Sequence, residues 1–225
     1  MSLAVSIIIP VLNEGDSLPV CLDALQSFRQ YGHELIVVDG GSKDDSLNIA
    51  KQYADTVVTS AAGRARQMNR GAEMATGDIL LFLHADTGFS DEAFRMLTDL
   101  VNNKAVWGRF DVRLSGPNWL FRVIESMMNL RSRFTGIVTG DQCLFVGREL
   151  FESIGGFPDI AIMEDVAISK VLKRTGRPVC LHSSVITSSR RWETNGIVST
   201  VLLMWSMRLL YFFGASPERL SRMYR

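Results

Sequence analysis

Several polar residues directly follow apolar segments of this chain, where their side chains could bind a charged ligand. Asn13 and Glu14 come after the apolar residues 5–9, Asp39 ends a second apolar run, and Asp86 comes just after a third. Carboxylates bind divalent cations, or they accept hydrogen bonds from the N–H groups of a nucleotide base. Because aspartate is also common in turns and at helix starts, a purely structural role for Asp86 is the alternative.

The elements that would position these residues are alternating strands and helices. Four apolar runs have the length of buried strands: residues 5–9, 34–38, 56–59 and 79–83. The first strand should stop at Pro10, which cannot donate a hydrogen bond to a neighbouring strand. Apolar residues at helical spacing between residues 18 and 28 predict a helix capped by Asp16 or Ser17. This alternation predicts a doubly wound, mostly parallel sheet whose strand ends bring the polar residues to one crevice.

The composition fits one folded domain. Hydrophobic residues make up 47% of the chain, which is enough for a sizeable core. Because 24 basic and 24 acidic residues cancel, no overall positive field favours nucleic-acid binding. Cys21, Cys143 and Cys180 lack metal-binding spacing and predict buried thiols in a reducing compartment. The start of the chain has no signal-peptide pattern, so we expect a cytoplasmic protein.

Five segments of the chain, taken in order, form a recognisable set of motifs. They are VSIIIPVLNEGDSL, ELIVVDGGSKDDS, GRARQMNRGAEMATGDILLFLHADT, GDQCLFVGRELFESIGGFPDIAIMEDVAIS and SSRRWETNG. Their order and spacing resemble the family 2 glycosyltransferases, which have the Rossmann-like GT-A fold. The resemblance implies a single domain over residues 1–225, with a nucleotide-binding half (1–87), an acceptor and catalytic half (88–196), and a C-terminal helix with a basic tail (197–225).

On the donor side, the resemblance implies four positions that bind the nucleotide of a nucleoside-diphosphate sugar: Pro10, Asn13, Glu14 and Asp39. The Asp39 carboxylate could accept a hydrogen bond from the ring N–H of uracil or guanine, so this residue does not decide which base is bound, although UDP is favoured. Asp86 corresponds to the last aspartate of the family's D-x-D motif, which holds Mn²⁺ or Mg²⁺ against the diphosphate. Arg64 and Arg66 would brace the diphosphate, or one of the two is a solvated helix residue.

His84 stands where the family motif has its first aspartate. A neutral imidazole can bind Mn²⁺, or it can form a hydrogen bond with the ribose or a phosphate. We expect the hydrogen-bonding role. The alternative is a histidine that only packs at the end of the strand.

The second half holds the implied catalytic residues. Asp141 and Gln142 resemble an acceptor-side segment of the family, and Glu164 and Asp165 stand at the predicted start of a helix. Asp165 corresponds to the general base that takes the proton of the acceptor hydroxyl, and Glu164 supports the site or orients the acceptor. A single displacement would invert the anomeric carbon. The helix dipole offers an ordinary structural reason for two carboxylates at such a position.

Arg191 and Trp192 resemble the end of the QxxRW motif of processive family members. Ser188 occupies the glutamine position, and this departure argues against processive polymer synthesis. Arg191 and Trp192 would close over the diphosphate and the acceptor. A structural arginine–aromatic pair is the alternative.

Two apolar helices follow in the second half. Residues 118–133 predict a helix whose apolar face packs in the core, with a lipid-facing role as the alternative. Residues 197–213 form a nearly all-apolar segment that is too short, with Arg208 inside it, for us to predict a membrane span. Flanking arginines and aromatic residues suit peripheral contact with an anionic membrane surface. Packing on the catalytic domain or in a homodimer interface is equally open.

The sequence therefore predicts an enzyme that moves a sugar from a nucleoside-diphosphate sugar to an acceptor hydroxyl, with a lipid among the candidate acceptors. One alternative is a nucleotide-sugar-binding or membrane scaffold protein that lost catalysis when His84 replaced an acid. A second is a sugar nucleotidyltransferase. That class needs a glycine- and arginine-rich loop after the first strand, where this chain has VLNEGDSL.

Overall fold

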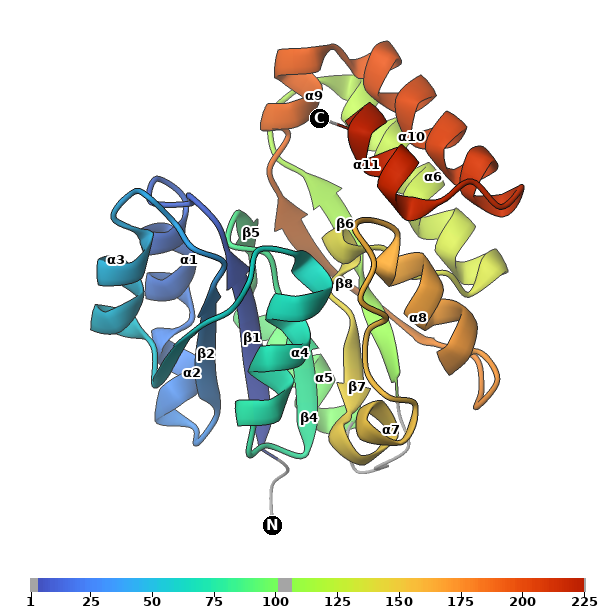
Figure 1. Ribbon diagram of the computed structural model, residues 1–225. Helices are drawn as coiled ribbons and strands as arrows, with labels where there is room; N and C mark the ends of the chain where they lie inside the picture. The colour runs from blue at the N-terminus through green and yellow to red at the C-terminus, as the bar shows by residue number, and fades with distance from the viewer. Residues whose placement is uncertain (1–3, 101–106, 225) are drawn as a thin grey trace.

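The computed structural model describes residues 4–100 and 107–224, which contain one continuous eight-stranded sheet (Figure 1). The strands are β1 (Val5–Val11), β2 (Glu34–Asp39), β3 (Thr56–Thr59), β4 (Ile79–Phe82), β5 (Thr87–Gly88), β6 (Trp107–Leu114), β7 (Phe145–Gly147) and β8 (Val179–Thr187). Their order in the sheet is β3-β2-β1-β4-β7-β6-β8-β5. The first four are parallel, β7 is antiparallel to β4 and β6, and β8 is parallel to β6. The predicted mostly parallel α/β fold is confirmed.

Helices cover both faces of the sheet. They are α1 (Leu18–Ala24), α2 (Gln26–Gln30), α3 (Ser46–Tyr53), α4 (Arg64–Met74), α5 (Asp91–Leu100), α6 (Trp119–Thr135), α7 (Arg148–Ser153), α8 (Glu164–Leu172), α9 (Arg190–Asn195), α10 (Ile197–Phe212) and α11 (Pro217–Tyr224), with a 3₁₀ turn, η1 (Gly140–Gln142). Ile7 and Ile9 of β1 pack with α1, α2, α3 and α5, whereas Ile8 packs with α4, α7 and α8. Alternate side chains of the central strand thus hold two helical layers together.

The first strand runs through Pro10 to Val11, so the predicted stop at Pro10 is wrong. Ile8 is the last β1 residue paired with β4, which ends at Phe82, whereas pairing with β2 continues to Val11. The Val11 carbonyl accepts a hydrogen bond from Gly40, on the β2 side. Pro10 therefore faces the side where β4 has already ended, and its missing N–H breaks no hydrogen bond between the strands.

The helix predicted between residues 18 and 28 is divided in two at Leu25, which ends α1 and precedes α2. Ser17 is the N-cap residue of α1, as one of the two predictions had it, but its side chain caps no backbone N–H and its hydroxyl instead donates to the Glu14 carboxylate at 2.7 Å. The apolar residues that defined the prediction are all buried: Leu18, Cys21, Leu22, Leu25 and Phe28.

The apolar face of α6 is exposed, so its predicted packing in the core is wrong. Trp119 keeps 69% of its surface and Met127 keeps 48%. Polar side chains hold the helix on β6 instead. Asn129 exchanges two hydrogen bonds with the backbone of Val112, and Glu125 accepts one from Leu114. These contacts turn the polar side of α6 toward the sheet and the apolar side outward. The strand predicted over residues 106–114 appears as β6, and residue 106 lies outside the described residues.

The C-terminal segment forms two helices where one helix and a tail were predicted. α10 ends at Phe212, and Gly214 adopts a left-handed φ of 86° before α11 begins. Met207 and Leu220 are buried together with Met163, next to the start of α8. These helices lie with α6 at the upper right of Figure 1, across the molecule from α1, α2 and α3. In residues 4–100 and 107–224, no helix is both long and apolar enough to cross a bilayer.

Candidate active site

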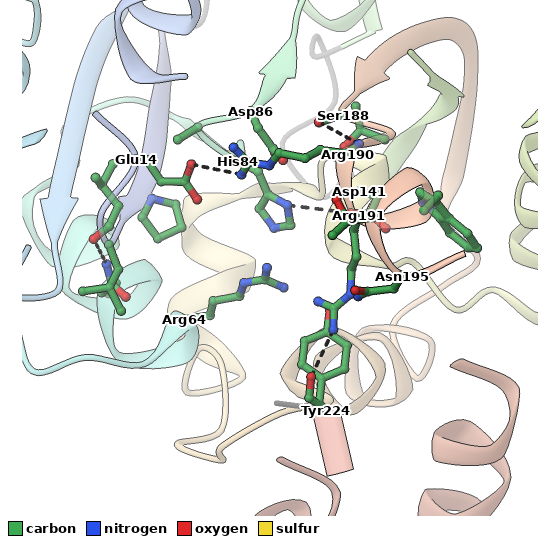
Figure 2. A pocket seen from close by; sticks show the side chains of 18 of the residues that line it. Glu14, Arg64, His84, Asp86, Asp141, Ser188, Arg190, Arg191, Asn195 and Tyr224 are labelled. Carbon is green, nitrogen blue, oxygen red and sulfur yellow. Dashed lines mark hydrogen bonds and ion pairs between the residues drawn. The ribbon is translucent and has the colours of Figure 1, made fainter. Parts of the chain in front are cut away.

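A pocket of about 610 Å³ opens beyond the ends of β1 and β4 (Figure 2). The sequence-predicted residues that line it are Pro10, Glu14, Arg64, His84, Asp86, Asp141, Arg191 and Trp192. They come from the end of β1 and the loop after it, the first residue of α4, the turn after β4, η1 and α9. Segments spread over most of the sequence thus meet at one edge of the sheet.

Asp86 shares the pocket with two further carboxylates, Glu14 and Asp141. Burial raises the pKa of Asp86, and the negative charges of Glu14 and Asp141 raise it further. Within the described residues, no three His, Cys, Asp or Glu side chains converge closely enough to hold a metal ion alone. Mg²⁺ and Mn²⁺ are commonly bound by one or two carboxylates together with substrate phosphates and water. Glu14 is paired with Arg190 at 3.9 Å, and the carboxylate oxygens of Asp86 and Asp141 are donors of the kind that such an ion binds.

His84 is neutral at physiological pH. Burial and the positive charge of Arg64 lower its pKa to about 3. Its Nδ1 atom lies 3.8 Å from Asp141 Oδ1, and its ring packs on Gly140, where an added Cβ atom would come within 2.7 Å of the ring. The uncharged ring can therefore bind a metal or form a hydrogen bond, and both roles stay predictions.

Arg64 extends into the pocket from the start of α4 (Figure 2). Burial by surrounding protein lowers its pKa, but the carboxylates of Glu164, Asp141 and Asp165 outweigh that effect and raise it above the usual value. No described carboxylate lies within ion-pair distance of its guanidinium. A fully charged arginine is thus directed at the pocket, with no carboxylate of residues 4–100 and 107–224 paired to it.

Glu164 and Asp165 lie at the start of α8, behind the η1 wall of the pocket. They line a small neighbouring cavity with Gly140 rather than the large pocket itself. The backbone N–H of Gly140 donates to Asp165 Oδ2 at 3.1 Å, and that of Val166 donates to Oδ1 at 2.7 Å. Burial and the neighbouring Asp165 raise the pKa of Glu164 to about 7. The predicted base is therefore held in a defined position next to Asp141.

Four predicted binding residues do not line the pocket: Asn13, Asp39, Arg66 and Gln142. The Asn13 and Asp39 side chains accept hydrogen bonds from backbone N–H groups of residues 41–43 and so shape the turn after β2. Arg66 is exposed and pairs with Asp159 at 2.7 Å. Gln142 is buried and donates to Ser132 at 3.0 Å. Of the two arginines, Arg66 is the solvated one.

Several pocket residues were not predicted from the sequence, among them Tyr224 and Gln67. Tyr224 of α11 lies under the Arg191 guanidinium, 3.6 Å from ring centroid to Cζ, and its carbonyl accepts a hydrogen bond from Arg191 (Figure 2). Gln67 is buried and donates to the carbonyls of Val11 and Val38, both at 2.8 Å, which joins α4 to β1 and β2. No sequence pattern around Tyr224 indicates that it lies in the pocket. Gln67 could have been noticed, because it stands at a helix position where an apolar residue is the usual choice.

A family model described as glycosyl transferase family 2 matches residues 6–153, from β1 through α7. The chain belongs to this family. Among curated relatives, the uncharacterized glycosyltransferase YibD of Escherichia coli is 32% identical over 152 residues, covering 63% of this chain and 43% of the relative. A PGL/p-HBAD biosynthesis glycosyltransferase of Mycobacterium bovis is 43% identical over 88 residues, covering 36% of this chain and 34% of the relative. The matched region spans less than half the length of either relative.

Solved structures share the GT-A fold of this family 2 chain. A mannosyltransferase from Pyrobaculum calidifontis, in complex with GDP-Man and Mn²⁺, superimposes with a TM-score of 0.67 at 20% identity over 98% of this chain and 68% of the other. Residues 1–349 of TarS from S. aureus, in complex with UDP-GlcNAc, give a TM-score of 0.67 at 19% identity over 82% of this chain and 58% of the other. At these identities the likeness establishes the fold alone.

Proposed function

We propose that this chain transfers a sugar from a nucleoside-diphosphate sugar, with UDP as the nucleotide, to an acceptor hydroxyl with inversion of the anomeric carbon. One observation carries the proposal: the pocket holds the carboxylates of Asp86, Glu14 and Asp141 beside the guanidinium of Arg64, which has no ion-pair partner among the described residues. A diphosphate with a divalent cation has matching charges, because carboxylates bind the cation and a guanidinium binds phosphate. Relatives of known structure bind UDP-GlcNAc or GDP-Man, which supports the donor class.

In this proposal, Asp86 would hold Mn²⁺ or Mg²⁺, an ion that stabilises the negative charge of the departing diphosphate. Arg64 would bind the diphosphate from the α4 side, and Arg191 would do so from α9. The acceptor oxygen forms a bond to the anomeric carbon as the bond from that carbon to the diphosphate oxygen breaks. The proton of the acceptor hydroxyl passes to the Asp165 carboxylate. Because Asp165 lies behind η1, the acceptor would have to approach from that side of the pocket.

The donor is tested by the melting-temperature shift with UDP, GDP, CDP and dTDP, each with and without Mn²⁺, because a ligand that binds only the folded state raises apparent stability. We expect a Mn²⁺-dependent shift with UDP. Arg64→Gln should abolish it. Arg66→Gln, the same change two positions along α4 on an exposed side chain, should keep it. If none of the four nucleotides shifts the melting temperature, the proposal is contradicted. If only GDP shifts it, the donor is a guanosine-diphosphate sugar.

Replacement of Asp165 by asparagine separates an enzyme from a protein that only binds nucleotide sugars. An enzyme with Asp165 as base should lose sugar transfer or donor hydrolysis while the UDP-dependent melting shift persists. Unchanged turnover would remove Asp165 from the role of base. A wild-type protein that binds UDP but shows no turnover with any acceptor would support the binding-only alternative.

We further propose that the acceptor is carried by a lipid and that the chain contacts the membrane surface. Exposed apolar residues lie along two helices: Trp119, Val123, Met127, Leu130 and Phe134 on α6, and Val198, Leu202, Trp205, Leu209 and Phe212 on α10. Large exposed apolar areas of this kind mark contact sites for membranes or proteins. Leu202→Ser with Leu209→Ser should reduce flotation with anionic vesicles, whereas Val20→Ser, on exposed α1, should not. Absence of flotation together with a dimer mass in solution would assign the surface to a homodimer.

A further inference from the structure

A groove of about 170 Å³ separates α6 from α10. Its walls are apolar, with Ile124 and Met128 on the α6 side and Val201 and Met204 on the α10 side. The groove also touches Asp141, Trp192 and Met204, which line the large pocket as well. It therefore leads from the exposed apolar faces of the two helices to the candidate active site.

Two arginines project into this apolar groove, Arg131 from α6 and Arg208 from α10. Neither makes an ion pair with a carboxylate of the described residues. The Nε atom of Arg131 is buried without a hydrogen-bond partner in the described part of the chain, and its Nη2 atom makes only a 3.4 Å contact with Thr139. A buried polar atom without a partner is costly, so a further hydrogen-bond acceptor beside this guanidinium would be stabilising.

The groove is lined by two arginines and one carboxylate, Asp141, so its charges do not cancel. Burial, followed by the repulsion of Arg208, lowers the pKa of Arg131 to about 10, and burial also lowers that of Arg208. Arg131 therefore stays positively charged at neutral pH. The chain as a whole is neutral, yet residues 115–135 and 188–224 contain eight arginines, three glutamates and no other charged residue. An anion between the two guanidiniums would relieve their repulsion.

We infer that the groove binds a membrane-embedded amphiphile whose anionic head group lies between Arg131 and Arg208 and whose apolar chain lies along the two helices. The donor diphosphate is a poorer occupant, because the groove walls are apolar and the donor pocket has its own arginines, Arg64 and Arg191. That this amphiphile is the acceptor of the sugar rests on the proposed function, whereas the binding of the amphiphile to the groove does not. A hydroxyl next to the bound head group would lie at the Asp141 end of the groove, near Asp165.

The test is a titration of the protein with dodecyl phosphate below its micelle concentration, followed by tryptophan fluorescence, since Trp192 and Trp205 line the groove. Dodecyl maltoside and inorganic phosphate provide the apolar chain and the anion separately. We expect tight binding of dodecyl phosphate only. Arg208→Gln should weaken it about tenfold, as for the loss of one hydrogen bond to a charged group. Arg95→Gln, which removes the same charge from the exposed surface of α5, should leave it unchanged.

Three results would overturn the inference. The first is that the Arg208→Gln variant binds dodecyl phosphate as tightly as the wild type, and the second is that inorganic phosphate binds as tightly as dodecyl phosphate. The third is that Arg208→Gln also loses the UDP-dependent melting shift, which would assign Arg208 to the donor site. Arg208→Gln is the decisive variant, because Arg208 makes no ion pair with the described residues and circular dichroism will report whether the variant folds. If UDP gives no shift in the wild type while dodecyl phosphate binds as expected, the proposed function fails and the groove inference stands.

Discussion

Replacement of Glu164 by glutamine should stabilise the protein above pH 7 and flatten the dependence of its stability on pH. Glu164 begins α8 with 6% of its surface exposed. Burial and the charge of Asp165 raise its pKa from 4.5 to about 7, against the opposing effect of Arg64. The folded state therefore holds the Glu164 proton more tightly than the unfolded state does.

The sign and size of the effect follow from this difference. Proton binding at Glu164 contributes its full stabilisation below the unfolded pKa of 4.5, and that contribution is lost as the pH rises through about 7. The shift corresponds to about 3 kcal/mol of unfolding free energy, which is roughly 6–12 °C in melting temperature for a chain of this size. Glutamine is neutral and of similar shape, so it should avoid that loss. The two proteins should be similar near pH 5 and differ by about this amount near pH 9.

Urea unfolding between pH 5 and pH 9 measures the difference directly. Glu149→Gln is the matched control, because Glu149 also lies in the first turn of a helix but is exposed. Its curve should follow the wild type at every pH. Parallel curves for the wild type and Glu164→Gln across the whole range would show that Glu164 ionises in the folded protein as it does in the unfolded chain, and the reasoning would be refuted.

Three further substitutions test individual parts of the site and its support. Gly140→Ala places a methyl group 2.7 Å from the His84 ring, so it should lower the melting temperature and weaken the UDP-dependent shift. Arg109→Met removes a fully buried guanidinium that pairs with Asp111, which keeps its second pair with Arg133, and urea unfolding should show a loss of about 1–3 kcal/mol. Asp86→Asn should abolish the Mn²⁺ dependence of the UDP shift, as measured by the same melting assay.

Each of these has a control at a site that lacks the relevant contact. Gly88→Ala brings its methyl group no closer than 3.7 Å to a neighbour and should be nearly neutral. Arg113→Met changes an exposed arginine of the same strand as Arg109. Asp16→Asn removes an exposed carboxylate from the loop after β1. If any control matched the effect of its partner substitution, the specific contact would not be the cause.

The first half of the fold was predictable because its strands are short apolar runs, of which β1, β2 and β4 are almost completely buried. The structure begins and ends β3 at the predicted residues, and β2 differs only by including Asp39. The second half was less predictable, because β7 pairs antiparallel with both neighbours and α6 reverses the usual orientation of an amphipathic helix. The apolar pattern of α6 was correctly identified, but the polar anchors Glu125 and Asn129 that turn it outward depend on the backbone of β6.

The candidate site shows the same division. Asp86 and Glu14 follow strands, so topology brings them together and the sequence alone could predict their meeting. The carboxylate of Asp39 and the amide of Gln142 have equally suggestive positions, yet both serve local backbone or buried side-chain contacts. Tyr224 reaches the pocket through the packing of α11, a long-range contact that no local pattern encodes.

The way in which α6 is attached to β6 also protects the sheet. Within the part of the chain that the structure describes, β6 pairs with β7 only at Trp107 and Gly108, and no other described strand lies on that side of β6 further along. There Asn129 donates to the carbonyl of Val112 and accepts from its N–H, which are the two hydrogen bonds that an added strand would make. Exposed strand edges are templates for aggregation. The apolar surface of α6 thus faces outward without leaving an open β edge. A change such as Asn129→Leu would remove both hydrogen bonds to Val112 and leave an open strand edge beside an exposed apolar surface.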